Sequence, residues 1–287
     1  MNIIDDLKLQ YKIGGISNRI IYWNVGIFIH SIPLFFQFRM GYFEYPSWLA
    51  LSSNPNDVIF YPWTLLSYAF LHSGFRHLFF NMLVLNFSSR LFLTFFTQKQ
   101  FFGLYILSAI FSGLAFVTSY FFLGINAPIV GASGAVMAIL VGATTYQPLM
   151  EVRLFLFGNV KLWYITAVLL LLDAMQIMIE NTGGHIAHLS GAFFGFIFIK
   201  LLQNGTDLSR IVSSILDFFV NLFQPKKNKT FRKVHVNPRR PEPQRESKIV
   251  TKDKTQQQID EILDKISQSG YDSLTASEKE FLFKAGR

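Results

Sequence analysis

Six apolar segments dominate the first two thirds of this 287-residue chain. They cover roughly residues 20–37, 75–95, 101–123, 131–148, 161–179 and 185–203. Each is close to the ~20 residues that a helix needs to cross the hydrocarbon core of a bilayer. The runs are continuous rather than alternating, and backbone N–H and C=O groups find no partners in lipid, so we expect helices rather than barrel strands. The sequence therefore predicts an all-α, polytopic membrane protein with six transmembrane helices.

Charged residues are concentrated near the C-terminal end. Residues 1–200 hold 10 Lys/Arg and 7 Asp/Glu, and residues 201–287 hold the other 16 and 11. Charged residues make up 15% of the whole chain, against the ~25% of ordinary soluble domains. This distribution excludes a single soluble globular domain. The absence of cysteine excludes disulfides, thiolate metal sites and a cysteine nucleophile.

The basic residues between the segments predict the orientation. Six spans place both termini on one side of the membrane, and the outer segments would then carry only Arg39 and Arg76. The inner segments would carry Lys8, Lys12, Arg19, Lys99, Arg153, Lys161, Lys200 and the basic run after residue 225. The positive-inside rule therefore predicts a multi-pass protein of the cell (inner) membrane with cytoplasmic termini. Residues 1–19 are a cytosolic segment, and residues 20–203 form the six-helix domain.

Three polar regions follow the last span. Apolar side chains at helical spacing in residues 204–224 predict an amphipathic helix on the inner membrane surface. Residues 225–256 form a basic flexible linker that favours anionic lipid headgroups, and not nucleic acid, because the basic run adjoins a membrane anchor. In residues 257–287, an apolar stripe and a capping box from Thr275 to Glu278 predict a small helical hairpin.

Polar side chains inside a span are costly, so each indicates a specific role. Ser133 lies near the start of the fourth span, where free N–H groups favour a negative charge such as an oxyanion. Small residues recur at every fourth position: Gly134, Ala138 and Gly142 in the fourth span, and Ala187, Gly191 and Gly195 in the sixth. Packing of these two faces would bring Ser133 to His188, the nucleophile–base pair that activates a serine.

The second span carries His77 and Asn81, four residues apart and therefore on one helix face. Both side chains can donate hydrogen bonds, as groups that stabilise an oxyanion must.

These residues resemble the motifs of the rhomboid family of intramembrane serine proteases. The matches are Gly131-Ala132-Ser133-Gly134 to GxSG, Ala187-His188 with Gly191 and Gly195 to AHxxGxxxG, and His77 with Asn81 to HxxxN. The three motifs occur in order on the expected spans, over roughly residues 20–203. The resemblance implies a Ser133–His188 dyad without a third acid. It also implies an oxyanion hole built from the Ser133 backbone N–H, His77 and Asn81.

Each motif alone has a structural explanation. Ser133 would be a packing serine, His188 a structural histidine, and His77 with Asn81 an interhelical clamp. Met137 departs from the family, since many relatives have a Tyr there that stacks on the catalytic imidazole. Asp173, the only acid well inside a span, is interpreted as bonding a neighbouring helix rather than as a third triad member, and His185 as a loop residue. Glu180 to Gly184 are interpreted as a loop that could move as a gate.

The expected function is cleavage of a peptide bond within or next to a transmembrane segment of a single-span or polytopic membrane protein. No HExxH motif for zinc is present, and we expect neither a metal nor a cofactor. One alternative is a catalytically inactive rhomboid-like protein that binds membrane clients. A transporter is disfavoured, because one intramembrane Asp and no evident inverted repeat offer little for ion movement.

Overall fold

The computed structural model describes residues 2–154, 158–179, 181–223 and 254–285. The chain divides into two compact units, Met1–Lys226 and Lys227–Arg287. Nearly all of the predicted linker, residues 225–256, lies outside the described residues. Each unit is therefore treated by itself.

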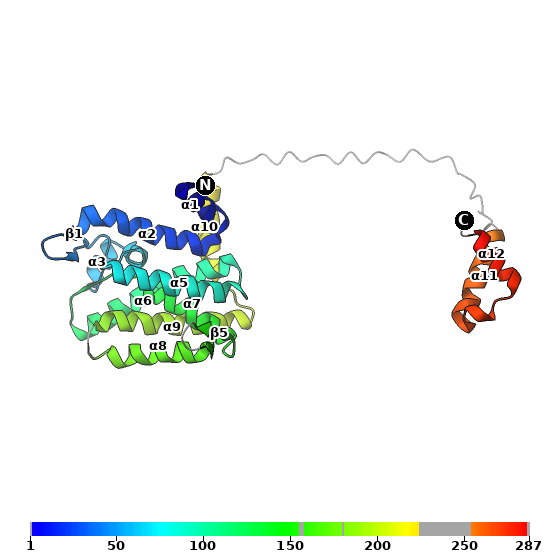
Figure 1. Ribbon diagram of the computed structural model, residues 1–287. Coiled ribbons are helices and arrows are strands. Elements are labelled where there is room, and N and C mark those ends of the chain that lie inside the picture. The colour runs from blue at the N-terminus through cyan, green and yellow to red at the C-terminus, as the bar shows by residue number, and fades with distance from the viewer. Residues whose placement is uncertain (1, 155–157, 180, 224–253, 286–287) are drawn as a thin grey trace, which may run out of the picture. The chain divides into compact units, whose positions relative to one another are not determined.

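Six helices of the first unit coincide with the six apolar segments (Figure 1). They are α2 (Gly15–Phe35), α5 (Phe75–Leu93), α6 (Gln98–Leu123), α7 (Ser133–Tyr146), α8 (Leu162–Gln176) and α9 (Thr182–Gln203). The prediction of a mostly helical chain is confirmed. Among the described residues, α6 and α9 are long and apolar enough to cross a membrane, while α7 and α8 are apolar but shorter. Six crossings therefore stay a prediction.

The unit also contains three pairs of short strands within a fold that stays mostly helical. The strands pair as β1 (Phe36–Gln37) with β2 (Tyr42–Phe43), β3 (Leu51–Ser52) with β4 (Pro128–Ile129), and β5 (Glu151–Leu154) with β6 (Gly158–Lys161). All three pairs are antiparallel. Such pairs satisfy backbone groups in loops that periodicity does not reveal. The β3–β4 pair also anchors the chain directly ahead of α7.

Smaller helical elements precede α2 and lie in the long loop between α2 and α5. These are α1 (Ile3–Ile13), α3 (Pro55–Phe60), α4 (Thr64–Ser67) and the 3₁₀ turn η1 (Tyr68–Phe70). The loop packs inward, because Tyr68 is buried and its hydroxyl donates to the carbonyl oxygen of Ala109 on α6 at 2.7 Å.

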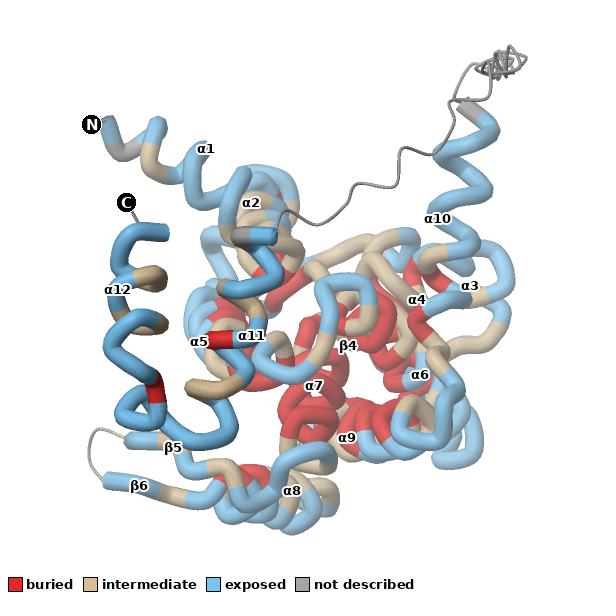
Figure 2. The backbone as a smooth tube through the Cα atoms, turned by 90° about the vertical axis from the view of Figure 1, so that its right-hand side faces the viewer, coloured by how far each residue is buried: buried red, intermediate tan, exposed pale blue. Residues whose placement is uncertain are grey.

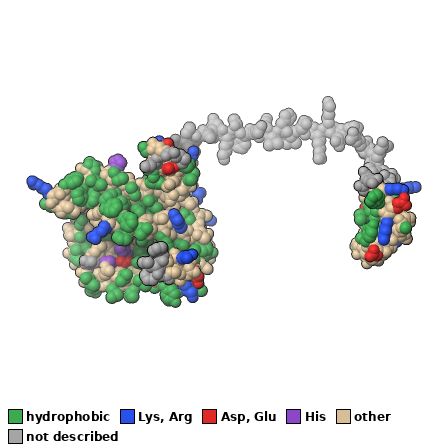
Figure 3. Space-filling model, viewed as in Figure 1, with side chains coloured by type: hydrophobic (Ala, Val, Ile, Leu, Met, Phe, Trp, Pro, Cys, Tyr) green, Lys and Arg blue, Asp and Glu red, His purple; other side chains and the backbone are tan. Residues whose placement is uncertain are grey.

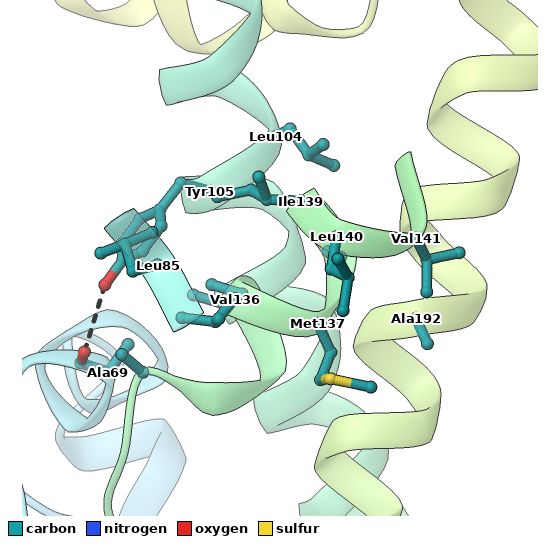
Figure 4. Packing of buried hydrophobic residues seen from close by; sticks show 14 of the residues in the cluster. Ala69, Leu85, Leu104, Tyr105, Val136, Met137, Ile139, Leu140, Val141 and Ala192 are labelled. Atoms are coloured by element: carbon teal, nitrogen blue, oxygen red, sulfur yellow. Dashed lines mark hydrogen bonds between the residues drawn. The ribbon is translucent and has the colours of Figure 1, made fainter. Parts of the chain in front are cut away.

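Helix α7 is the centre of the bundle. All of its residues from Gly134 to Ala143 are buried, and it packs against α5, α6 and α9 (Figure 2). Figure 4 shows side chains of α7, among them Val136, Leu140 and Val141, pointing away from the helix in different directions. A helix that is apolar all round is expected to be surrounded by other elements. The residue that begins α7, Ser133, is thereby held by three neighbouring helices.

The small-residue faces of α7 and α9 lie against each other. A Cβ atom at Gly191 would overlap the carbonyl oxygen of Gly134, and one at Gly195 would overlap that of Ala138. Only a residue without a side chain permits this approach of two backbones. The contact brings the start of α7 beside the turn of α9 that contains His188.

Helix α8 lies on the outer side of α9 (Figure 1). Of its 15 residues, all described, Leu162 and Thr166 are the buried ones. The exposed positions are mostly apolar, such as Val168, Leu171 and Met175. Hydrophobic side chains likewise cover much of the face shown in Figure 3, as expected for a bundle surrounded by lipid.

A further helix, α10 (Ser209–Phe223), follows α9, within the segment for which an amphipathic helix was predicted. It starts against α6, where a Cβ atom at Gly103 would overlap the side chain of Ser209. Most of its apolar residues beyond Val212 are exposed.

The second unit is a helical hairpin of α11 (Lys254–Ser269), the 3₁₀ turn η2 (Tyr271–Ser273) and α12 (Ala276–Ala285). The expected capping box is present, since Glu278 Oε2 accepts from the backbone N–H of Thr275 at 2.7 Å. Lys265 Nζ on α11 reaches Glu278 Oε1 at 2.9 Å and links the two helices.

Candidate active site

A cavity of about 300 Å³ lies between α5, α7, α8 and α9. The four side chains to which the sequence analysis assigned chemistry all line it: Ser133, His188, His77 and Asn81. Met137, Asp173 and His185 line it as well. Residues from four helices thus meet in one space large enough to admit a short stretch of polypeptide.

Ser133 is the first residue of α7, where backbone N–H groups lack partners within the helix. The chain reaches it through Gly131, which has φ of 139° and whose N–H donates to the carbonyl oxygen of Tyr68 at 2.9 Å. A Cβ atom at Gly131 would lie 2.9 Å from Nε2 of His77 and 3.5 Å from Oγ of Ser133. Glycine at this position therefore lets the imidazole approach the hydroxyl.

His77 is held by the loop that precedes α5. Its Nδ1 lies 3.4 Å from the backbone N–H of Ser73, which donates to it, and 3.0 Å from the Ser73 hydroxyl. An accepting Nδ1 leaves the proton of a neutral ring on Nε2. This N–H lies beside Gly131 and Ser133 and can act as a donor.

Asn81 lies one turn further along α5 and is buried. Its Nδ2 donates to the carbonyl oxygen of His77 at 2.8 Å. An amide nitrogen has two N–H groups, so a second donor remains for a group in the cavity.

His188 lies in the second turn of α9, and its Nδ1 is 2.9 Å from Oδ1 of Asp173. A carboxylate only accepts, so Nδ1 carries the proton and Nε2 keeps its lone pair. Within the described residues, no hydrogen bond joins Ser133 Oγ to His188. Catalytic contacts are often long before substrate binds, so their shared cavity is the relevant observation.

Asp173 bonds a neighbouring helix, α9, as the sequence analysis expected, whereas the interpretation of His185 was wrong. The same Oδ1 of Asp173 is 2.7 Å from Nδ1 of His185, so one carboxylate oxygen contacts two imidazoles. His185 is not a loop residue, because α9 already begins at Thr182. The connection between α8 and α9 covers residues 177–181, so residues 182–184 of the predicted gate loop belong to α9, and Glu180 lies outside the described residues. A lone acid inside a span was the signal that required these partners.

The sequence model of the rhomboid domain matches residues 60–204, just over half of the chain. The chain belongs to the rhomboid family. The match contains every residue that lines the cavity, whereas α1, α2 and most of the first loop precede it. A family of unknown function (DUF6576) matches residues 250–284, which include the helical hairpin. A search of curated proteins found no match to the chain.

As a member of this family, the chain is a membrane protein. The family consists generally of intramembrane serine proteases. Two features separate its cavity from the expected pattern of the family. Met137 is buried at the position where many relatives have Tyr, and a carboxylate faces Nδ1 of His188, where no third acid was expected.

The group of Asp173, His185 and His188 also has the donor types of a divalent metal site, with ligand atoms within 4.8 Å of one another. Ligands at ~2.1 Å from one tetrahedral ion are separated by roughly 3.3 Å. The two contacts of Asp173 measure 2.7 and 2.9 Å, which are hydrogen-bond distances.

Proposed function

We propose that this rhomboid is an intramembrane serine endopeptidase that uses a Ser133–His188 dyad. One observation carries the proposal: a hydroxyl at a helix start, an imidazole with a free Nε2 and two further side-chain donors line the same cavity. Such a combination is what acyl transfer to a serine needs.

In the proposed reaction, Ser133 Oγ attacks the scissile carbonyl carbon while Nε2 of His188 takes the hydroxyl proton. The tetrahedral intermediate then collapses, and His188 returns this proton to the leaving amine. A water molecule then attacks the acyl-enzyme. Nε2 of His188 takes a proton from this water and returns it to Ser133 Oγ as the acyl product leaves. The proton on Nδ1 stays in place throughout.

Three donors are proposed to stabilise the oxyanion: the backbone N–H of Ser133, Nε2–H of His77 and the free N–H of Asn81. The N-terminal end of the α7 dipole favours the same negative charge. Preorganised donors lower the activation free energy strongly, because no free energy is spent on orienting them during the reaction.

The proposed substrate is a single-span or polytopic membrane protein cleaved within or next to a transmembrane segment. The proposed topology has six spans in the cell membrane with both termini in the cytoplasm. The basic run after residue 225 is proposed to contact anionic lipid headgroups. Helices conceal their carbonyl groups, so helix-breaking residues near the scissile bond would favour cleavage.

The test uses purified protein in lipid vesicles with a membrane-spanning reporter and a serine-directed fluorophosphonate. The wild type is expected to cleave the reporter and to be labelled. Ser133→Ala and His188→Ala are each expected to abolish cleavage, and Ser133→Ala to abolish labelling.

Normal cleavage by Ser133→Ala would refute the dyad. Failure of the folded wild type both to cleave and to be labelled would instead favour the inactive, client-binding alternative.

A further inference from the structure

Asp173 stands out because it is the single carboxylate among the residues that line the cavity. Its side chain is 13% exposed, and those of His185 and His188 are 11% and 22% exposed. A poorly solvated carboxylate is stable only when donors satisfy it. Here the two donors come from α9, and one of them is the proposed catalytic base.

We infer that Asp173 is a positioning residue for His188, and this inference rests on the proposed protease function. The hydrogen bond from Nδ1 at 2.9 Å holds the imidazole in the Nδ1–H tautomer. This tautomer leaves Nε2 as the only ring nitrogen that can accept the Ser133 proton. The carboxylate also faces the imidazolium that forms during attack and stabilises its charge.

The protons balance without any step on Asp173 itself. One proton moves from Ser133 Oγ to Nε2 of His188 as the O–C bond to the substrate forms. The same proton then leaves with the amine as the C–N bond breaks. Asp173 remains ionised and His188 keeps its Nδ1 proton, so the acid orients and stabilises the base without relaying a proton.

His185 holds the carboxylate in this position. It lies three residues before His188 on α9, so both rings project from one face of the helix. Its 2.7 Å contact to Oδ1 is the shorter of the two and restrains the rotation of the Asp173 side chain. His185 is thus a second positioning residue that acts through Asp173.

The carboxylate comes from α8, which is the outer helix of this part of the bundle (Figure 1). Away from Asp173, α8 is tied to α7 by a hydrogen bond between the hydroxyls of Thr144 and Thr166 at 2.6 Å. Asp173 lies about two turns beyond Thr166, among residues that are exposed or half-buried. His188 is consequently oriented only while this end of α8 rests against α9.

The deciding experiment measures kcat and KM of reporter cleavage for Asp173→Asn in lipid vesicles. We expect kcat to fall by about 10²-fold or more with KM changed less than about twofold, because the loss affects the base rather than binding.

Asp173→Glu keeps the charge and should recover part of the lost activity. Thr166→Val is the matched control: it removes the hydroxyl contact between α8 and α7, lies outside the cavity, and should leave kcat unchanged. A chelator such as EDTA should leave the wild-type rate unchanged.

A wild type that cleaves the reporter alongside an Asp173→Asn variant with the same kcat would overturn the inference while leaving the protease function intact. A folded wild type without cleavage or labelling would instead overturn the protease function. If Asp173→Asn does not fold, ¹⁵N NMR of histidine in the wild type decides the question. The proposal requires the Nδ1–H tautomer for His188, and the Nε2–H tautomer would contradict it.

Discussion

His77 and Asn81 show how single side chains acquire their roles from their immediate partners. The Ser73 N–H directs the proton of His77 to Nε2, and the carbonyl of His77 engages one N–H of Asn81. In both residues a donor remains on the side of the cavity. Neither contact could be assigned from residue types alone, because each depends on the rotamer.

We predict that His77→Ala and Asn81→Ala each lower kcat by ~10²–10³-fold, because each removes one proposed oxyanion donor. Fluorophosphonate labelling should slow but persist, since Ser133 and His188 are intact. Asn86→Ala, a substitution on the same helix outside the cavity, is the matched control and should retain activity. Equal activity of Asn81→Ala and Asn86→Ala in the vesicle assay would contradict a role for the amide.

At the scale of elements, the contact between α7 and α9 decides whether the site exists. These helices approach at Gly191 and Gly195 so closely that a methyl group would meet a backbone carbonyl oxygen. Backbone atoms in a packed core cannot yield as a flexible side chain can. The site therefore depends on glycines that touch no substrate.

We predict that Gly191→Ala separates α7 from α9 and destabilises the bundle by about 1–3 kcal/mol. Thermal unfolding in micelles and fluorophosphonate labelling measure the two effects, and both the Tm and the labelling rate should fall. Gly26→Ala is the control, because a Cβ atom at Gly26 on α2 would meet no atom within 4 Å. An unchanged Tm and labelling rate in Gly191→Ala would show that the bundle tolerates a wider spacing.

In the helical hairpin, Glu278 combines a cap and an ion pair. The backbone N–H of Thr275, the ammonium of Lys265 and the hydroxyl of Thr275 lower the pKa of Glu278 from 4.5 to about 2. An acid whose pKa is lower in the folded state stabilises the fold above its unfolded value. This contribution is complete above pH 4.5 and is lost as the pH falls toward 2.

Pepsin digestion of the full chain at acidic pH tests whether ionised Glu278 stabilises the hairpin. Protection of residues 254–285 should decrease as the pH falls from 4.5 toward 2. Glu278→Gln should weaken the hairpin and flatten this pH dependence. Glu280→Gln removes only an exposed pair with Lys284 and should behave like the wild type. Identical digestion of both variants would mean that the Glu278 contacts do not stabilise the hairpin.

At the scale of the whole molecule, the cavity belongs entirely to the first unit. Its lining comes from α5, α7, α8 and α9, whereas the helical hairpin belongs to the second unit. The rhomboid match lies within the first unit, and the match at residues 250–284 lies within the second. The residues that line the cavity therefore all come from the first unit.

We predict that a chain ending at Lys226 cleaves the membrane reporter with kcat within about twofold of the full chain, because every proposed reacting group is retained. A chain ending at Gln203 also loses α10, whose Ser209 packs on Gly103, and should unfold at a lower temperature. Loss of activity in a correctly inserted chain ending at Lys226 would assign the hairpin a catalytic or regulatory role.

The six apolar helices, the small-residue faces of α7 and α9, and the capping box of the hairpin followed from the amino-acid sequence alone. Each is a local pattern: apolar runs require helices in lipid, glycines and alanines every fourth residue mark one face, and Thr275 reaches a residue only three positions away. The same patterns singled out Ser133, His188, His77 and Asn81, which the structure brings to one cavity.

The environment of His188 was decided only by the tertiary structure. The connection between α8 and α9 lies three residues earlier in the chain than the sequence patterns predicted, and His185 belongs to α9 rather than to a loop. Whether a side chain of α8 reaches a ring on α9 depends on the rotation of both helices about their axes. Packing against α7 sets that rotation, and no periodicity within a single helix encodes it.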